Sequence, residues 1–205
     1  MSLDGFVAGP NQSVENPIGI GGMRLHEWAF ALAIWRDQHG MEGGETNEST
    51  PVVEESLANI GATVMGRNMF GGHPGGWDAK KPWDGWWGVN PPFHHPVFVL
   101  THHKREPLVL EGGTTFTFVT NGIEAALNQA RQAAGGKDVS LAGGAKAAQQ
   151  YLAAGLVDEM EINLAPTLLG SGERLFEGVG DDLHGLELVR TVAAPQVVHL
   201  KFARR

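Results

Sequence analysis

The stretch Leu141-Ala142-Gly143-Gly144-Ala145-Lys146-Ala147 decides the fold of this chain. The segment from Val139 to Ala142 predicts a strand, and the residues after the two glycines predict a helix that extends to about Ala154. A glycine pair between a strand and a helix allows the first amides of the helix to face a pyrophosphate. The alternative is that the glycines only permit close packing, since the stretch is neither a P-loop nor a spaced-glycine dinucleotide motif.

Two more predicted strands end in turns of a similar kind. The strand from Ala62 to Met65 leads into Gly66-Arg67-Asn68-Met69, where the glycine admits a ligand close to the backbone and Arg67 can bond a phosphate. The strand from Val97 to Thr101 leads into His102-His103-Lys104-Arg105, which can hold a phosphate on a ribose. For each turn the alternative is a solvated turn with a surface cation. Ligands of open α/β sheets bind at the carboxyl ends of the strands, so three such ends favour one ligand that crosses them.

The order of the predicted elements indicates the fold class. After residue 50 strands alternate with helices, which predicts an α/β fold with a mostly parallel central sheet flanked by helices. The tail from Leu186 to Ala203 predicts two strands, joined near Ala194-Pro195-Gln196, that add an antiparallel pair at one edge. The chain has no repeat of about 20 to 50 residues and no second hydrophobic core with its own linker. We therefore expect one domain over residues 1–205.

Two segments rich in aromatic residues stand out. The segment from Arg24 to Gln38 predicts a helix with apolar residues on two sides, so we expect a second cover from a loop, a ligand or a partner subunit. The segment from Gly71 to Pro92 is rich in glycine, proline and tryptophan, has no clean period and is predicted to be a long loop. Loops of this length in compact domains are often lids or binding loops.

Composition and charge limit the classes of function. The 205 residues include no cysteine, which excludes disulfides, thiolate metal sites and cysteine nucleophiles and fits a reducing, cytoplasmic location. The formal net charge of -8 argues against a nucleic-acid partner, although a small anionic ligand needs only local amides and a few cations. No signal peptide is recognisable and no apolar run approaches the roughly 18 residues that span a bilayer, so we expect no membrane partner.

Six short motifs follow one another in a fixed order along the chain. They are Ser2-Leu3-Asp4-Gly5-Phe6-Val7-Ala8-Gly9, Gly66-Arg67, Thr101-His102, Gly143-Gly144-Ala145-Lys146, Gly155-Leu156-Val157-Asp158-Glu159 and Pro166-Thr167-Leu168-Leu169-Gly170-Ser171-Gly172. This ordered set resembles the dihydrofolate reductase-like family over nearly the whole chain. Within that family, the chain most resembles the C-terminal reductase domain of the bifunctional deaminase–reductase of bacterial riboflavin biosynthesis.

The resemblance implies a sheet flanked by helices, NADPH as the cofactor across the strand ends, and a homodimer. Carried over by position, it places the cofactor phosphates at Gly66, Arg67, Asn68 and Met69, and the pyrophosphate at Gly143, Gly144, Ala145 and Lys146. It places the adenosine 2′-phosphate at Thr101, His102, His103 and Lys104, and the nicotinamide near Val7 and Ala8.

Three residues are candidates for the substrate site. Hydride transfer chiefly needs the nicotinamide placed against an electrophilic carbon, so few side chains are obligatory. Asp4, where the family places the substrate pocket, is a candidate catalytic and substrate-binding residue, and the alternative is a cap on the Asp4-Gly5 turn. His26 is a second candidate for both roles, and the alternative is a satisfied histidine on an amphipathic helix. Trp28 can stack on a flat heterocycle, although core packing is the commoner role.

These observations predict an NADPH-dependent reductase of a small pyrimidine- or pterin-like heterocycle, without a decision between the two substrate classes. The first alternative is a nucleotide-binding module of the same fold without reductase activity. The second is a metal protein that uses His94, His95, His102 and His103. Adjacent residues of a strand point to opposite faces, which weakens that alternative, and we expect no metal.

Overall fold

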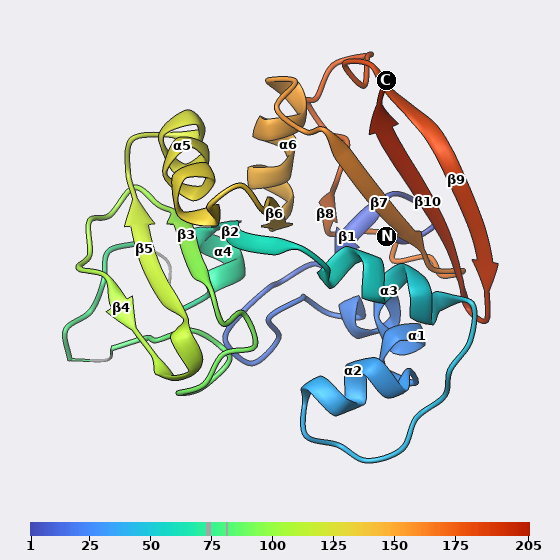
Figure 1. The fold of residues 1–205 in the computed structure, drawn as a ribbon, viewed down its shortest axis with the longest axis horizontal. Coiled ribbons are helices and arrows are strands. Elements are labelled where there is room, and N and C mark those ends of the chain that lie inside the picture. Colours follow the sequence, from blue (N-terminus) through green and yellow to red (C-terminus); the bar gives the residue numbers. More distant parts are fainter. Residues whose placement is uncertain (73–74, 81) are drawn as a thin grey trace. The chain divides into compact units, whose positions relative to one another are not determined.

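The structure is a computed structural model that describes residues 1–72, 75–80 and 82–205. It contains two compact units, of which the first comprises residues 1–12, 18–58 and 149–205 and the second residues 13–17 and 59–148. Both units contain helices and strands (Figure 1). The three strand ends with predicted phosphate-binding turns all belong to the second unit.

The second unit is built on a five-stranded sheet with the order β4-β5-β3-β2-β6. Its strands are β2 (Ile60–Gly66), β3 (Pro96–Leu100), β4 (Leu108–Val109), β5 (Thr115–Val119) and β6 (Asp138–Gly143). The four longer strands pair in parallel, and β4 is an antiparallel strand at one edge. The last five residues of β2 are all buried, as is typical of a strand covered on both faces. The predicted mostly parallel sheet is confirmed.

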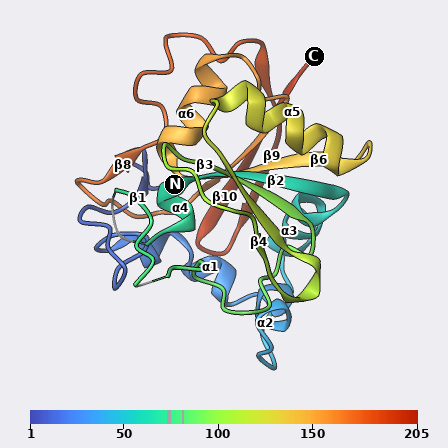
Figure 2. The same ribbon diagram turned by 90° about the vertical axis from the view of Figure 1, so that its left-hand side faces the viewer.

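Helices and aromatic side chains cover this sheet. The second unit contains α4 (Arg67–Phe70), the 3-10 helix η2 (Glu111–Gly113), α5 (Ile123–Ala134) and the start of α6 (Ala145–Ala153). The α5 helix lies across β2, β3 and β6 and buries Ala126, Leu127 and Ala130 (Figure 2). A hydrophobic cluster forms around Phe70, Val97, Val99, Phe116 and Phe118, and tryptophans of the 71–92 segment pack against it. The predicted loop over residues 71–92 therefore contributes to the core, although positions 73, 74 and 81 lie outside the described residues.

The first unit contains two small sheets. Its strands are β1 (Phe6–Ala8), β7 (Glu159–Leu164), β8 (Glu173–Arg174), β9 (Leu186–Ala194) and β10 (Val197–Arg204). Strands β1 and β8 pair with each other, and β7-β10-β9 form an antiparallel sheet. The predicted antiparallel C-terminal pair is confirmed as β9 and β10. Among the described residues it does not extend the parallel sheet, because the free edge of β10 pairs with β7 over six positions.

The predicted single helix from Arg24 to Gln38 is wrong. The chain forms η1 (Gly22–Leu25), α1 (Glu27–Phe30) and α2 (Ala33–Gln38), and α3 (Ser49–Leu57) follows. Leu32 is extended, because the amide of Ala33 donates to the carbonyl of Glu45 and the amide of Glu45 donates to the carbonyl of Ala31. No helix formed by the described residues has the length and apolar character needed to cross a membrane.

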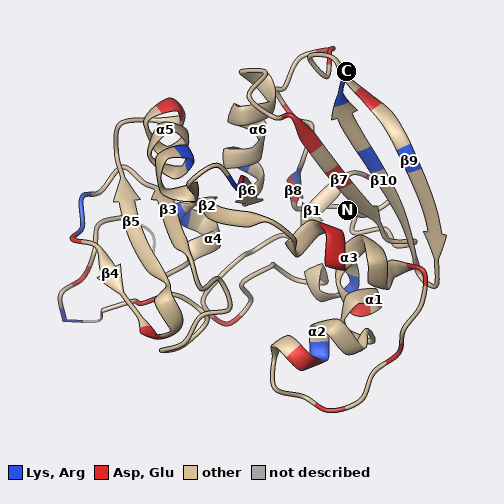
Figure 3. Ribbon diagram, in the orientation of Figure 1, with Lys and Arg blue, Asp and Glu red and all other residues tan. Residues whose placement is uncertain are grey.

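Charged residues of the β7-β10-β9 sheet and of α3, which Figure 3 colours by sign, form a network of ion pairs. Lys201 on β10 lies opposite Glu161 on β7 and Arg190 on β9 in the strand register. Glu55 of α3 binds both Arg190 and Lys201. Exposed ion pairs contribute little stability one by one, but a network that links three strands to a helix favours one register over a shifted one.

A buried histidine lies two residues before Lys201 on β10. His199 is fully buried, with Nε2 2.9 Å from the Ser49 hydroxyl and Nδ1 2.7 Å from the Asn163 amide oxygen. The amide oxygen can only accept, so Nδ1 carries the hydrogen and Nε2 accepts from Ser49. Burial, and then the charge of Arg190, lowers the pKa of His199. The ring also meets Trp28 edge-on at 5.0 Å, so one neutral imidazole joins α3, the sheet and α1.

We predict that His199→Gln destabilises the protein at pH 7 by about 1–3 kcal/mol, because it disturbs a buried hydrogen-bond network. The pKa of His199 lies below that of the unfolded chain, so protonation favours unfolding. The stability that neutral His199 contributes is complete above pH 6.5 and falls as the pH drops below it. Urea unfolding between pH 7.5 and 4.5 should therefore show a shallower loss of stability in the variant. An unchanged slope, matching that of the exposed-site control His102→Gln, would contradict the prediction.

Candidate functional site

The three predicted turns lie side by side at one edge of the five-stranded sheet. Strand β2 lies between β3 and β6, with Gly66 opposite Leu100 and Met65 opposite Gly143. Parallel pairing brings their carboxyl ends to the same edge, which is where ligands of open α/β sheets bind. The sequence prediction that these ends meet is confirmed, and their role in binding a cofactor stays a prediction.

Two glycines at this edge have different reasons for lacking a side chain. A Cβ atom on Gly66 would lie 3.2 Å from Cβ of Ala147 and 3.5 Å from the amide nitrogen of Gly144. Gly66 therefore permits close packing of β2 on the start of α6. A Cβ atom on Gly144 would meet no heavy atom within 4 Å. Only Gly144 borders open space, in front of the first turn of α6.

The Gly143–Gly144 turn itself is compact. Gly143 has a φ of +105°, and the peptide bond between the two glycines is cis. The carbonyl of Gly144 accepts hydrogen bonds from the amides of Ala147 at 3.0 Å and Ala148 at 3.1 Å, which starts α6. The amides that precede these two belong to the first turn of the helix, whose partial positive charge favours an anion.

The turn after β3 presents polar side chains to solvent. Thr101 is buried, and its amide donates to the carbonyl of Val119 at 3.0 Å. Its hydroxyl accepts a 3.2 Å hydrogen bond from the amide of His103. His102, His103 and Lys104 are exposed. Thr101 thus holds the turn, and the three side chains after it are accessible to a ligand.

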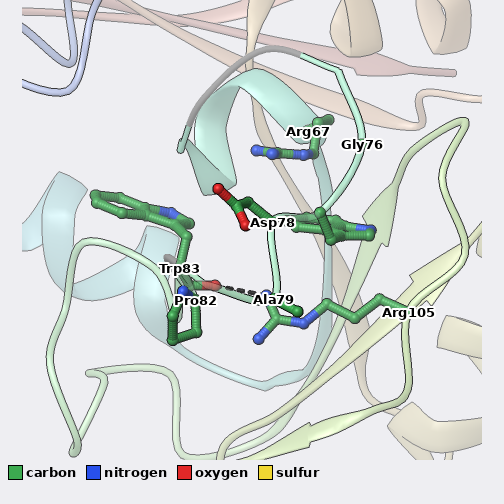
Figure 4. Close-up of a pocket in the computed structure, with 8 residues that line it drawn as sticks. Arg67, Gly76, Asp78, Ala79, Pro82, Trp83 and Arg105 are labelled. Atoms are coloured by element: carbon green, nitrogen blue, oxygen red, sulfur yellow. Dashed lines mark hydrogen bonds between the residues drawn. The ribbon is translucent and has the colours of Figure 1, made fainter.

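A cavity of about 250 Å³ lies next to these turns, within the second unit (Figure 4). It is lined by Arg67, Gly76, Trp77, Asp78, Ala79, Pro82, Trp83 and Arg105. In the view of Figure 4, Arg67 and Arg105 lie on opposite sides of Asp78. Arg105 donates to the Asp84 carboxylate at 2.7 Å and to the carbonyl of Trp83. Burial, and then the charge of Arg105, lowers the pKa of Arg67, which still stays protonated at neutral pH.

Trp77 is a cavity residue that the sequence prediction of the site missed. Arg105 belongs to the cationic turn that the sequence assigned to a phosphate, although the family resemblance placed only Thr101, His102, His103 and Lys104 there. Trp77 belongs to the aromatic loop that was predicted as a lid or binding loop, but this segment has no period from which to place one side chain. The centroid of the Trp77 ring lies 4.0 Å from the Arg67 guanidinium and 4.9 Å from that of Arg105.

Asp4, a candidate catalytic residue, lies in a hydrogen-bonded turn of the first unit. Its carboxylate accepts from the amide of Gly170 at 2.7 Å and from the amide of Leu169 at 3.2 Å. Arg174 donates to the carbonyl of Asp4 at 2.9 Å. A hydrogen bond from the Ser2 side chain, and then those from the two amides, lower the pKa of Asp4 to about 2. These contacts agree with the alternative reading of Asp4 as a cap, and its catalytic role stays a prediction.

The other candidate residues of the first unit differ in burial. His26 is half-buried, its Nδ1 lies 3.4 Å from the carbonyl of Gly22, and burial lowers its pKa. Trp28 is buried, donates its indole N–H to the carbonyl of Leu25 at 3.0 Å and belongs to a hydrophobic cluster. Ala8 is buried and Val7 is half-buried on β1. The packing of Trp28 is explained without a substrate, whereas His26 keeps part of its surface accessible.

The four histidines of the metal alternative make other contacts. His95 bonds the Thr63 hydroxyl at 2.7 Å through Nε2, and Nδ1 of His94 lies 2.9 Å from the carbonyl of Gly112. His102 and His103 belong to the exposed turn described above. Within residues 1–72, 75–80 and 82–205, no three histidine, aspartate or glutamate side chains are grouped as a metal site requires.

For Asp4→Asn we predict a lower unfolding temperature at pH 7, because an amide group can replace only one of the two acceptor oxygens. The pKa of Asp4 is lowered from 3.8 to about 2, so its ionised form contributes stability that is present above pH 3.8 and is lost as the pH falls toward 2. Thermal unfolding between pH 7 and 2 should show that acid lowers the unfolding temperature less in the variant than in the unaltered protein. The exposed residue Asp37 provides a matched control, and equal behaviour of Asp4→Asn and Asp37→Asn would contradict the prediction.

Comparisons with known proteins agree with this architecture. Solved structures similar to this chain include a protein from Shewanella sp. PV-4 that is named for riboflavin biosynthesis. Its sequence is 19% identical and the TM-score is 0.56, and the match covers 100% of this chain and 95% of that chain. A second is the diaminohydroxyphosphoribosylaminopyrimidine deaminase/5-amino-6-(5-phosphoribosylamino)uracil reductase of Thermotoga maritima, at 13% identity and a TM-score of 0.53. A third is RibD of Acinetobacter baumannii, at 17% identity and a TM-score of 0.55.

This chain is fully covered in the last two comparisons but spans only 54% and 55% of those proteins. At these identities the likeness shows the fold alone. No curated protein sequence matches the chain. The model of the RibD C-terminal domain family matches residues 1–200. The chain therefore belongs to the RibD C-terminal domain family, within the dihydrofolate reductase-like fold that its motifs indicate.

Proposed function

We propose that this protein is an NADPH-dependent reductase that transfers a hydride to a small, planar heterocycle. The observation that carries the proposal is the meeting of three turns, after β2, β3 and β6, at one edge of the parallel sheet. The open space at Gly144, in front of the first turn of α6, supports the binding of a phosphate group there. Membership of the RibD C-terminal domain family supports reduction as the reaction.

The residues at this edge fit the parts of NADPH. Gly143, Gly144, Ala145 and Lys146 would hold the pyrophosphate, because Gly144 borders open space and a helix starts at Ala145. The exposed side chains of His102, His103 and Lys104, after the buried Thr101, would surround the 2′-phosphate. Gly66, Arg67, Asn68 and Met69 would contact further phosphate oxygens. Val7 and Ala8, on β1 of the first unit, are the residues that the family resemblance assigns to the nicotinamide.

The bound cofactor would supply the hydride. The protein would bind and orient the cofactor and the substrate, and it would hold or move protons. Asp4 is a poor proton donor at neutral pH, because its pKa of about 2 keeps the carboxylate ionised. His26 has a lowered pKa and is mostly neutral at pH 7, so it can donate or accept one hydrogen bond at a substrate atom. Of the two candidates we therefore favour His26 for contact with the substrate and Asp4 for holding the turn.

The substrate class that we propose is a pyrimidine. One similar structure is named as a 5-amino-6-(5-phosphoribosylamino)uracil reductase, and this likeness in fold favours a pyrimidine over a pterin. The alternative of a nucleotide-binding module without reductase activity would share the three turns but not turn over a substrate. A homodimer and a cytoplasmic location are the remaining parts of the proposal.

The first test is a titration with NADPH and with NADH, followed by tryptophan fluorescence. We expect NADPH to bind at least tenfold more tightly, because even one charge-assisted hydrogen bond to the 2′-phosphate contributes about 1.5–3 kcal/mol. Oxidation of NADPH in the presence of an aminopyrimidine ribotide then distinguishes a reductase from a binding module. If neither nucleotide binds, the proposal is wrong.

The second test is the variant Gly144→Val, for which we predict loss of NADPH binding without loss of stability. A Cβ atom at this position meets no heavy atom within 4 Å, so the added side chain would extend into the space in which the phosphate would lie. Calorimetric titration measures binding, and thermal unfolding confirms that the fold is retained. Gly144→Ala is the matched control and should weaken binding less. Full NADPH affinity in a folded Gly144→Val protein would overturn the assignment of this turn.

A further inference from the structure

Trp77 makes the contacts that connect the cavity to the turn after β3. Its indole N–H donates to the carbonyl of His103 at 2.9 Å. The guanidinium groups of Arg67 and Arg105 lie 4.0 Å and 4.9 Å from the centroid of its ring. One side chain thus contacts two cations and the backbone of the turn that carries His102, His103 and Lys104.

The aromatic core fixes the position of this indole. The Trp77 ring meets Phe118 edge-on at 4.9 Å and Phe70 at 5.9 Å. Phe70 is fully buried, and both phenylalanines belong to the main hydrophobic cluster of the second unit. A rotation of the indole would therefore disturb the core as well as the two arginines. The arrangement around Trp77 is preorganised, which lowers the entropic cost of binding a ligand there.

The charges around Trp77 favour an anionic ligand. Arg67 and Arg105 are close enough for the charge of one to lower the pKa of the other. Asp84 binds Arg105, but its own side chain is 53% exposed, so water screens its negative charge. Asp78 also lines the cavity. Arg67, Arg105 and Lys104 carry three positive charges, against the two negative charges of Asp78 and Asp84, in a protein whose net charge is -8.

A purely structural reading is that the arginines only stack on the indole. Stacking alone would not require the indole N–H to hold His103, nor a cavity of about 250 Å³ that both cations line. A phosphate group, by contrast, would relieve the repulsion between the two guanidinium groups and would lie next to the exposed turn.

We infer that Trp77 is a positioning residue for cofactor selection, because it holds Arg67, Arg105 and the 102–104 turn in the geometry that distinguishes a 2′-phosphate from a 2′-hydroxyl. The inference rests on the proposed function. It assigns a role to one residue of the aromatic 71–92 segment, and it adds Arg105 to the residues that the family resemblance places at the phosphate. Trp77 itself need not touch the phosphate.

The experiment compares Trp77→Leu and Trp77→Phe with the unaltered protein by isothermal titration calorimetry, which does not depend on tryptophan fluorescence. The probes are NADPH, NADH, adenosine 2′-monophosphate and adenosine 5′-monophosphate. Trp77→Leu should weaken the binding of NADPH and of adenosine 2′-monophosphate about tenfold, which corresponds to a loss of roughly 1.4 kcal/mol of binding energy. It should change the affinity for NADH less than about twofold. Trp77→Phe keeps an aromatic face but lacks the N–H donor, so it should recover part of the lost selectivity.

A matched control and a double variant separate positioning from general loosening. Trp87→Leu removes an indole of the same segment that packs on Phe93 and Phe116, and it should leave the NADPH-to-NADH preference unchanged. Arg105→Gln should also reduce the preference. If Trp77 acts through Arg105, the double variant Trp77→Leu/Arg105→Gln should lose less NADPH binding energy than the sum of the losses in the two single variants.

The outcomes distinguish this inference from the proposed function. If the unaltered protein prefers NADPH and folded Trp77→Leu keeps the same preference, the inference is wrong and the proposed function stands. The inference is also wrong if Trp77→Leu weakens the binding of NADPH and of NADH equally, or if Trp87→Leu reduces the preference for NADPH as much as Trp77→Leu does. If the unaltered protein binds neither NADPH nor adenosine 2′-monophosphate, the proposed function fails and the inference fails with it.

Discussion

The parallel pairing of β2 with both β3 and β6 is the constraint on which the candidate site depends. Parallel strands end at the same edge of a sheet, so the pairing of Gly66 with Leu100 and of Met65 with Gly143 fixes three turns next to one another. The burial of β2 makes a shift in register costly, because it would expose apolar side chains. The position of the turns therefore follows from the hydrophobic core, not from contacts among the turns themselves.

The same core sets the electrostatics of the site. Phe70 and Phe118 hold Trp77, and Trp77 lies against Arg67 and Arg105. A positive region can therefore form in an acidic protein, because it depends on a few side chains held close together and not on the net charge of -8. Long-range attraction of an anion by the whole molecule is absent, so affinity would come from short contacts at the turns.

The sequence predicted the second unit better than the first. Apolar runs such as Val97 to Thr101 identify buried parallel strands because such strands are apolar on both faces. The helix predicted from Arg24 to Gln38 failed at Leu32, since its pairing with Glu45 is a contact between distant residues that periodicity does not reveal. Trp77 was missed for the same reason, because only packing on Phe118 and Phe70 brings its side chain to the turn after β3.

The contrast between Gly66 and Gly144 shows how far a motif can be interpreted without a structure. Both glycines end a predicted strand and both suggested a phosphate-binding turn. Ala147 occupies the space next to Gly66, so that glycine serves the packing of α6 on β2. Gly144 borders open space, so its missing side chain has no packing reason in the second unit. The packing reading therefore accounts for Gly66, whereas at the Gly143–Gly144 turn packing gives no such account and the ligand reading stays a prediction.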